Sequence, residues 1–146
     1  MTHEDAIAKI LDDQISGYRT LLELLQKERY LLIDFDVKGI EELYKEKDVL
    51  ILKLRLLEEE RIRRMKDFGS SELTLKTLAE QTGNSKFLDM RSKLKSLVQA
   101  IEELNGFNRI LIDRSLSYIK NSSGFFGTFG IGDRSPQKGM LLSRET

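Results

Sequence analysis

The sequence contains no cysteine, no tryptophan and a single proline. The absence of cysteine excludes a disulfide framework and thiol chemistry. Scarce proline, abundant leucine and 33% charged residues are together typical of long helices or a coiled coil rather than a compact mixed fold. A length of 146 residues favours one folded domain.

The chain also lacks a surplus of charge and any long apolar run. Its 24 basic residues balance 24 acidic ones, whereas a nucleic-acid-binding protein usually has a basic surplus, so no nucleic-acid partner is expected. No apolar run reaches about eighteen residues, so no stable membrane insertion is expected. The N-terminal MTHEDAIAK has neither the basic nor the apolar region of a signal peptide. We therefore expect a soluble, cytoplasmic protein.

Apolar residues recur at steps of three and four along most of the chain, which predicts helices. Three long helices are predicted at about 4–33, 37–67 and 85–121, with a short connecting helix at about 72–81. Asp36 is a plausible N-cap that would separate the first two, although one continuous kinked helix is the alternative. The predicted fold is all-α: an elongated antiparallel helical bundle or coiled coil over residues 1–121, followed by a flexible tail over 122–146.

The third long helix carries the most regular heptad pattern and two asparagines. Its seam residues are Phe87, Met90, Leu94, Leu97, Ile101, Leu104, Asn108, Leu111, Ser115 and Tyr118. Asn108 therefore occupies a seam position, and Asn105 lies beside it. A polar seam residue specifies register and partner at some cost in stability. Both asparagines either select a partner helix or bond within the bundle, and Gly106 between them allows close backbone approach or is tolerated on the solvent side.

Residues suited to catalysis or metal binding are scarce. The only histidine is His3, close to the terminus, where nothing positions it as a catalytic base. Carboxylates are scattered over helical surfaces without a calcium-loop pattern, and the glycines of FGTFGIGD do not open a helix after a strand. We therefore expect no metal, no cofactor and no enzymatic activity.

Partner binding is the function class that remains. Ile51, Leu52 and Leu56 lie beside the apolar stripe of the second helix, and Ile110, Ile112, Leu116 and Ile119 lie beside that of the third. An apolar face wider than its own bundle can cover is typical of a helix-binding groove or an oligomer seam. The alternative is that the short helix and the tail cover these residues.

The tail from residue 122 is rich in glycine and phenylalanine, with Phe125, Phe126 and Phe129 in sequence order. Such a segment either becomes ordered on a partner or covers the helical bundle. Two other functions stay open at this point. One is a homodimeric coiled-coil scaffold, and the other is a membrane-associated interaction protein whose phenylalanines enter a lipid surface.

Several stretches, taken in order, resemble one family. LNGFNRILID resembles the Leu-Asn-x-x-Asn-x-x-Leu segment in the last helix of the FlgN family of flagellar type III export chaperones. ELLQKERYLL, IEELYKEKDVLILKL and LLEEERIR are similar to the family's earlier helical stretches, with Lys47, Glu58 and Arg61 at matching positions. TFGIGD and KGMLLSRE are similar to its glycine-rich tail, with Phe129 where a tyrosine is usual. The resemblance covers nearly the whole chain.

This resemblance implies a cytosolic export chaperone without enzymatic activity. Such proteins bind the C-terminal helical segments of the hook-filament junction proteins FlgK and FlgL, prevent their premature assembly and deliver them to the export gate component FlhA. We expect an amphipathic cargo helix to dock along the C-terminal half of the third long helix. The candidate cargo-binding residues are Leu104, Asn105, Asn108, Leu111, Ile112, Leu116 and Ile119. Phe126, Phe129 and Gly130 are candidates for the export-gate or tail contact, and whether the free chain is a monomer or a homodimer stays open.

Overall fold

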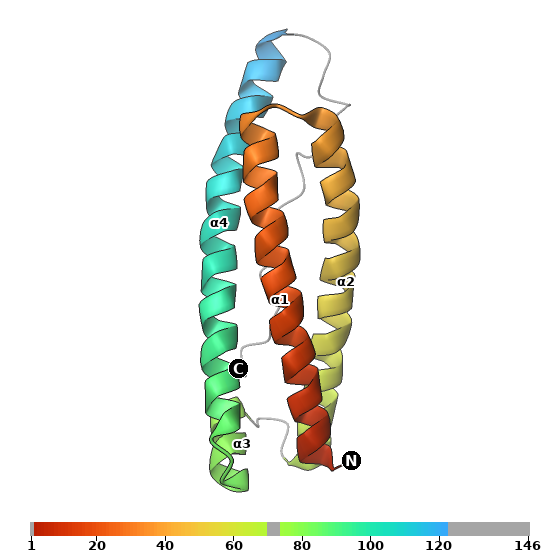
Figure 1. Ribbon diagram of the computed structural model, residues 1–146, viewed down its shortest axis with the longest axis vertical. Coiled ribbons are helices and arrows are strands. Elements are labelled where there is room, and N and C mark those ends of the chain that lie inside the picture. The colour runs from red at the N-terminus through yellow and green to blue at the C-terminus, as the bar shows by residue number, and fades with distance from the viewer. Residues whose placement is uncertain (1, 70–73, 123–146) are drawn as a thin grey trace.

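The computed structural model describes residues 2–69 and 74–122, which form four helices (Figure 1). Three are long, α1 (His3–Ile33), α2 (Val37–Phe68) and α4 (Lys86–Ser122), and α3 (Leu75–Thr82) is short. The all-α prediction of three long helices and a short connecting one is therefore confirmed. The predicted tail lies outside the described residues, apart from Ser122 at the end of α4.

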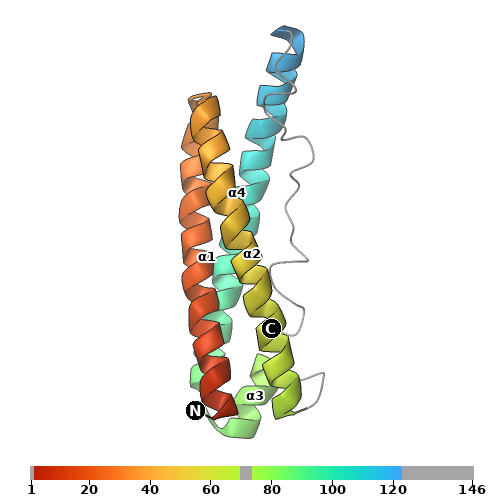
Figure 2. The same ribbon diagram turned by 90° about the vertical axis from the view of Figure 1, so that its right-hand side faces the viewer.

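The long helices lie side by side with α1 between the other two (Figure 1). Consecutive long helices run in opposite directions, so α4 runs parallel to α1. α1 packs along both neighbours, whereas α2 and α4 approach each other at few points. The C-terminal end of α4 extends beyond the turn between α1 and α2 (Figure 2). Among the described residues, α2 and α4 therefore each keep long stretches of surface without a helix packed against them.

The break between the first two helices occurs at the predicted cap. The Asp36 carboxylate accepts a hydrogen bond from the backbone N–H of Gly39 at 2.9 Å, which satisfies a donor at the start of α2. Phe35, directly before it, has a φ of 60°, in the left-handed region that few non-glycine residues adopt. The chain reverses here, so the alternative of one continuous kinked helix is wrong.

The short helix begins three residues later than the sequence pattern predicts. Thr74 caps it, since its hydroxyl accepts a hydrogen bond from the backbone N–H of Thr77 at 3.1 Å. A predicted start at residue 72 is therefore wrong. Its end is as expected, because Gly83 adopts a φ of 69°, which terminates a helix at no steric cost for glycine.

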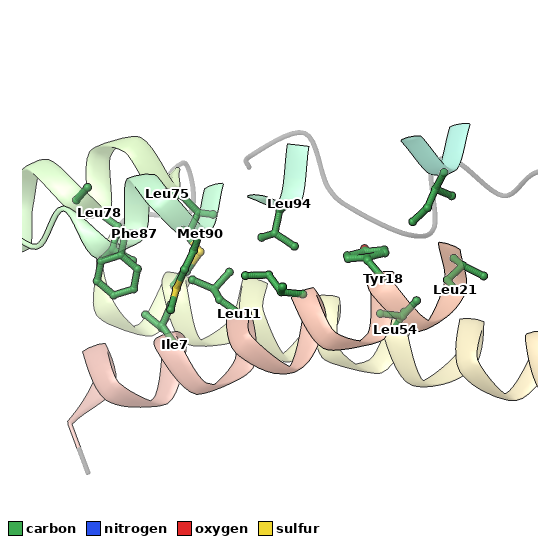
Figure 3. Close-up of a cluster of buried hydrophobic side chains, with 14 of the residues drawn as sticks. Ile7, Leu11, Tyr18, Leu21, Leu54, Leu75, Leu78, Phe87, Met90 and Leu94 are labelled. Atoms are coloured by element: carbon green, nitrogen blue, oxygen red, sulfur yellow. The ribbon is translucent and has the colours of Figure 1, made fainter. Parts of the chain in front are cut away.

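The main hydrophobic core lies where the four helices meet, towards the N-terminal end of α1 (Figure 3). Leu75 and Leu78 of α3 lie beside Phe87 and Met90 of α4, so the short helix closes this end of the bundle. The buried members of the core are Ile7, Leu11, Ile15, Tyr18, Leu21, Leu25, Leu54, Met65, Leu75, Leu78, Ala79, Phe87, Met90, Leu94 and Ile101.

A second, smaller cluster lies at the opposite end, beside the turn between α1 and α2. Its buried members are Leu32, Ile40, Leu43 and Tyr44, and partly buried side chains of α4 pack against them. The C-terminal half of α4 is therefore held by a smaller core than its N-terminal half.

The cap at Asp36 should contribute measurably to stability. We expect Asp36→Ala to lower the free energy of unfolding by about 1 kcal/mol, because a backbone N–H at the start of α2 loses its acceptor. The measurement is urea denaturation followed by helical circular dichroism. Asp34→Ala, an exposed neighbour in the same turn, is the matched control. An equal loss in both variants would show that the cap contributes nothing specific.

Candidate functional site

Asn108 lies at the centre of the candidate site and is 1% exposed. Its amide nitrogen donates to the backbone carbonyl of Leu25 at 2.9 Å and to the Glu28 carboxylate at 2.8 Å. Because both partners can only accept, the NH₂ group must face α1. The amide oxygen has no hydrogen-bond partner among the described residues. The sequence left open whether Asn108 selects a partner helix or bonds within the bundle, and in the structure it bonds within the bundle.

The same carboxylate also binds α2. Glu28 is 1% exposed, and its second oxygen accepts from the Lys47 ammonium at 3.3 Å. Lys47 is only partly buried and also lies over the ring of Tyr44, 5.6 Å from its centroid. Asn108, Glu28 and Lys47 therefore form one polar chain that joins α4, α1 and α2. A buried carboxylate with two such partners fixes the three helices in a single register.

The other asparagine has different surroundings. Asn105 is half-buried, and within the described part of the chain its side chain makes no hydrogen bond. Gly106 is exposed, and a Cβ atom added there would meet nothing within 4 Å. Gly106 is therefore tolerated on the solvent side rather than required for close approach. Asn105 keeps both a donor and an acceptor for another molecule.

The apolar candidates on α4 are half-buried. Leu111, Ile112 and Leu116 pack against the smaller core, and Leu104 packs against the main one. At 100° per residue, Asn105, Ile112 and Leu116 lie on one flank of the buried stripe, and Leu104 and Leu111 lie on the other. The structure thus groups an amide and two aliphatic side chains along one flank, which we call the α4 flank.

Four residues of the predicted site fall outside the described residues or side chains. Ile119 belongs to α4, but its side chain is not described. Phe126, Phe129 and Gly130 follow the last described residue. Their assignment as cargo, gate or tail contacts stays a prediction.

Exposed apolar residues of α4 also lie away from this flank. Phe107 is 48% exposed, and the Arg29 guanidinium lies 4.7 Å from its ring centroid. This cation–π contact ties the exposed ring to α1. The sequence pattern singled out the exposed Ile110 but missed Phe107, which lies one turn before it.

A second buried polar cluster lies between α1 and α2. The Arg61 guanidinium donates to both oxygens of Glu58, at 2.6 and 3.1 Å, and to the sulfur of Met65 at 3.0 Å. The Gln14 amide donates to Glu58 at 3.2 Å. Burial, followed by the nearby Glu58 carboxylate, raises the pKa of the Tyr18 hydroxyl, and Arg61 partly opposes this shift. The cluster therefore keeps one charge pair inside the bundle, with its hydrogen bonds supplied by both helices.

Sequence reasoning found only part of these two clusters. Lys47, Glu58 and Arg61 were noted as positions that match a family pattern, whereas Glu28 and Gln14 were missed. A signal for Glu28 was present, since it fills the one turn that the apolar stripe of α1 skips between Leu25 and Leu32. A polar residue at a seam position is a sign of a buried partner on a facing helix.

Neither cluster has the composition of a catalytic or metal site. Within residues 2–69 and 74–122, no group of three or more histidine or acidic side chains is placed to hold a metal ion. None of the helices described is long and apolar enough to cross a bilayer. The buried groups bond one another, and the half-buried groups offer area and an amide, which suits the binding of another helix.

In a comparison with protein-family models, residues 1–128 match the family described as FlgN protein. The chain belongs to the FlgN family. No match was found among curated proteins or among solved structures. FlgN proteins are non-enzymatic flagellar export chaperones that act in the cytoplasm and bind the hook-associated proteins FlgK and FlgL. Membership therefore implies an export chaperone role for this chain.

The two asparagines should differ sharply in their effect on folding. We expect Asn108→Ala to lower the free energy of unfolding by roughly 2–3 kcal/mol, because the Glu28 carboxylate and the Leu25 carbonyl each lose a buried donor. Asn105→Ala should change it by less than about 0.5 kcal/mol. Chemical denaturation of both variants measures the difference. Equal effects would contradict the role of Asn108 as a structural link.

The buried Glu58–Arg61 pair should behave as a unit. We expect Arg61→Ala to lower the free energy of unfolding by roughly 3–5 kcal/mol, because it leaves a buried carboxylate uncompensated. The double variant Glu58→Gln/Arg61→Met should recover most of that loss, since no buried charge remains. A double-mutant cycle from denaturation curves checks this, and purely additive losses would contradict it.

Proposed function

We propose that this FlgN protein binds an amphipathic C-terminal helix of a FlgK-like or FlgL-like protein along the α4 flank. The observation that carries the proposal is that Ile112 and Leu116 are half-buried against a small core, next to an amide without a partner. A cargo helix laid on this flank would cover the remaining apolar area, at about 25 cal/mol per Å² removed from water.

The two asparagines have separate tasks in this proposal. Asn108 holds α4 on α1, so that the flank is rigid before cargo arrives, and a preformed surface loses less entropy on binding. Asn105 hydrogen-bonds the cargo, which favours one register of the bound helix because a misplaced amide would stay unpaired. Leu104, Leu111 and Ile119 would then extend the apolar contact to either side.

Covering the cargo helix would prevent its premature assembly with other filament-junction subunits. We further propose that the chaperone delivers the cargo to an FlhA-like component of the export gate through Phe126, Phe129 and Gly130. This step rests on the resemblance of that segment to the family's tail. Replacing Phe129 with alanine should lower secretion of the cargo while leaving its affinity for the chaperone unchanged.

Calorimetric titration with the C-terminal segments of the FlgK-like and FlgL-like proteins from the same genome tests the binding step. We expect saturable binding that Ile112→Glu weakens at least about tenfold, equivalent to about 1.4 kcal/mol, because it places a charge within the apolar contact. Leu88→Glu, an exposed site near the start of α4, is the matched control. Asn105→Ala should instead change the ratio of the affinities for the two segments.

The outcomes of this titration are distinct. Absence of binding by a folded chaperone would overturn the proposal. Binding that Leu88→Glu weakens as much as Ile112→Glu would show that the cargo occupies another face.

A further inference from the structure

The outward face of α2 carries an apolar strip that nothing covers among the described residues. Val49 is 70% exposed, Leu52 is 52% exposed and Leu56 is 56% exposed. Together with Lys53 and Leu57 they line a shallow hollow of about 380 Å³. This strip points away from the side of α2 that packs on α1, so it is separate from the α4 flank.

Charged residues continue the same face in both directions along α2. Lys38, Glu42 and Lys45 precede the strip, and Glu60, Arg63 and Asp67 follow it. At 100° per residue, these six and the three apolar residues fall within a sector of about 80°. All nine are exposed except Glu60, which is half-buried. We call this set the α2 face.

The α2 face is complementary to the same face of a second copy when the two helices run antiparallel. If a two-fold axis passes between positions 52 and 53, Val49 meets Leu56 of the second copy. Lys38 then meets Asp67, Glu42 meets Arg63 and Lys45 meets Glu60. Because a two-fold axis repeats every contact, each of these opposite-charge pairs forms twice. We propose that two copies of the chain associate through this face in an antiparallel arrangement.

The charges also select this register over its neighbours. A shift of three residues in one direction keeps apolar residues together but places Lys45 against Arg63. A shift of four residues in the other direction places Lys38 against Arg63 and Glu42 against Glu59. Like charges brought together this way are unfavourable, whereas the proposed register has none among its three charge pairs. Charge complementarity is thus the argument for a second copy rather than an unrelated helix.

The interface has few apolar residues and many ion pairs, which determines its strength. α2 spans about 48 Å, and most of its contact would be charged and solvent-accessible, so the dimer should be reversible and weakened by salt. In the single chain, Glu60 accepts hydrogen bonds from Arg63 and from Arg64. Dimerisation therefore only requires Arg63 to turn towards Glu42 of the second copy. The inference does not depend on cargo binding.

Sedimentation velocity of the full chain between about 1 and 200 μM tests the proposal. We expect a monomer–dimer equilibrium within this range, weakened about tenfold when salt rises from about 0.05 to 0.5 M. Leu52→Lys should abolish the dimer, because in this register it places an ammonium group against Lys53 of the second copy, twice. Leu88→Lys is the control that adds the same charge at an exposed site elsewhere. A chain that stays monomeric, or a dimer unchanged by Leu52→Lys, would overturn the proposal.

A charge-swap experiment tests the register itself. Glu42→Arg alone and Arg63→Glu alone should each weaken self-association, because each places like charges together twice. A mixture of these two variants should associate about as well as the original chain, since both pairs again have opposite charge. The double variant Glu42→Arg/Arg63→Glu should likewise recover. Failure of both the mixture and the double variant to recover, with circular dichroism unchanged, would overturn this register.

Discussion

The architecture depends on one buried carboxylate. Glu28 of α1 accepts from Asn108 of α4 through one oxygen and from Lys47 of α2 through the other, so a charge that would be costly if unpaired instead joins all three long helices. A second contact, from Asn84 in the turn before α4 to Glu4 at 3.0 Å, has the same separation of 80 residues along the chain. The two parallel helices therefore keep one constant register from the start of α1 to the smaller core.

The sequence predicted the helices well because their signals are local. Period, caps and glycine stops all act within a few residues, so the break at Asp36 and the end at Gly83 were both foreseen. The polar clusters were harder to predict. Glu28, Lys47 and Asn108 each interrupt the apolar stripe of a different helix, and only the folded structure shows that they bond one another. Asn105 and Asn108 show most clearly what the sequence alone could not predict. The two positions differ by a rotation of only about 60° around α4. Yet Asn105 is half-buried without a partner among the described residues, whereas Asn108 is buried and bonds to α1.

The three long helices thus have different roles in the bundle. α1 is covered on two sides and contributes Glu28 to one buried polar cluster and Gln14 to the other, so it serves as the scaffold. α2 and α4 each have one neighbour among the long helices, and each presents a different surface: a charged, self-complementary face on α2 and an aliphatic flank with a free amide on α4. Because these surfaces are separate, the proposed self-association through α2 would leave the proposed cargo-binding flank of α4 unoccupied.

The direction of the helices has one further consequence. α1 and α4 point the same way and α2 points the other way, so the partial charges at the helix ends do not cancel: one helix dipole is left unopposed. An added helix that runs with α2 would place its positive end near the negative ends of α1 and α4. The bundle would then contain two long helices of each direction. The fold therefore favours one polarity of bound helix, with the N-terminus of the guest beside the C-terminal end of α4.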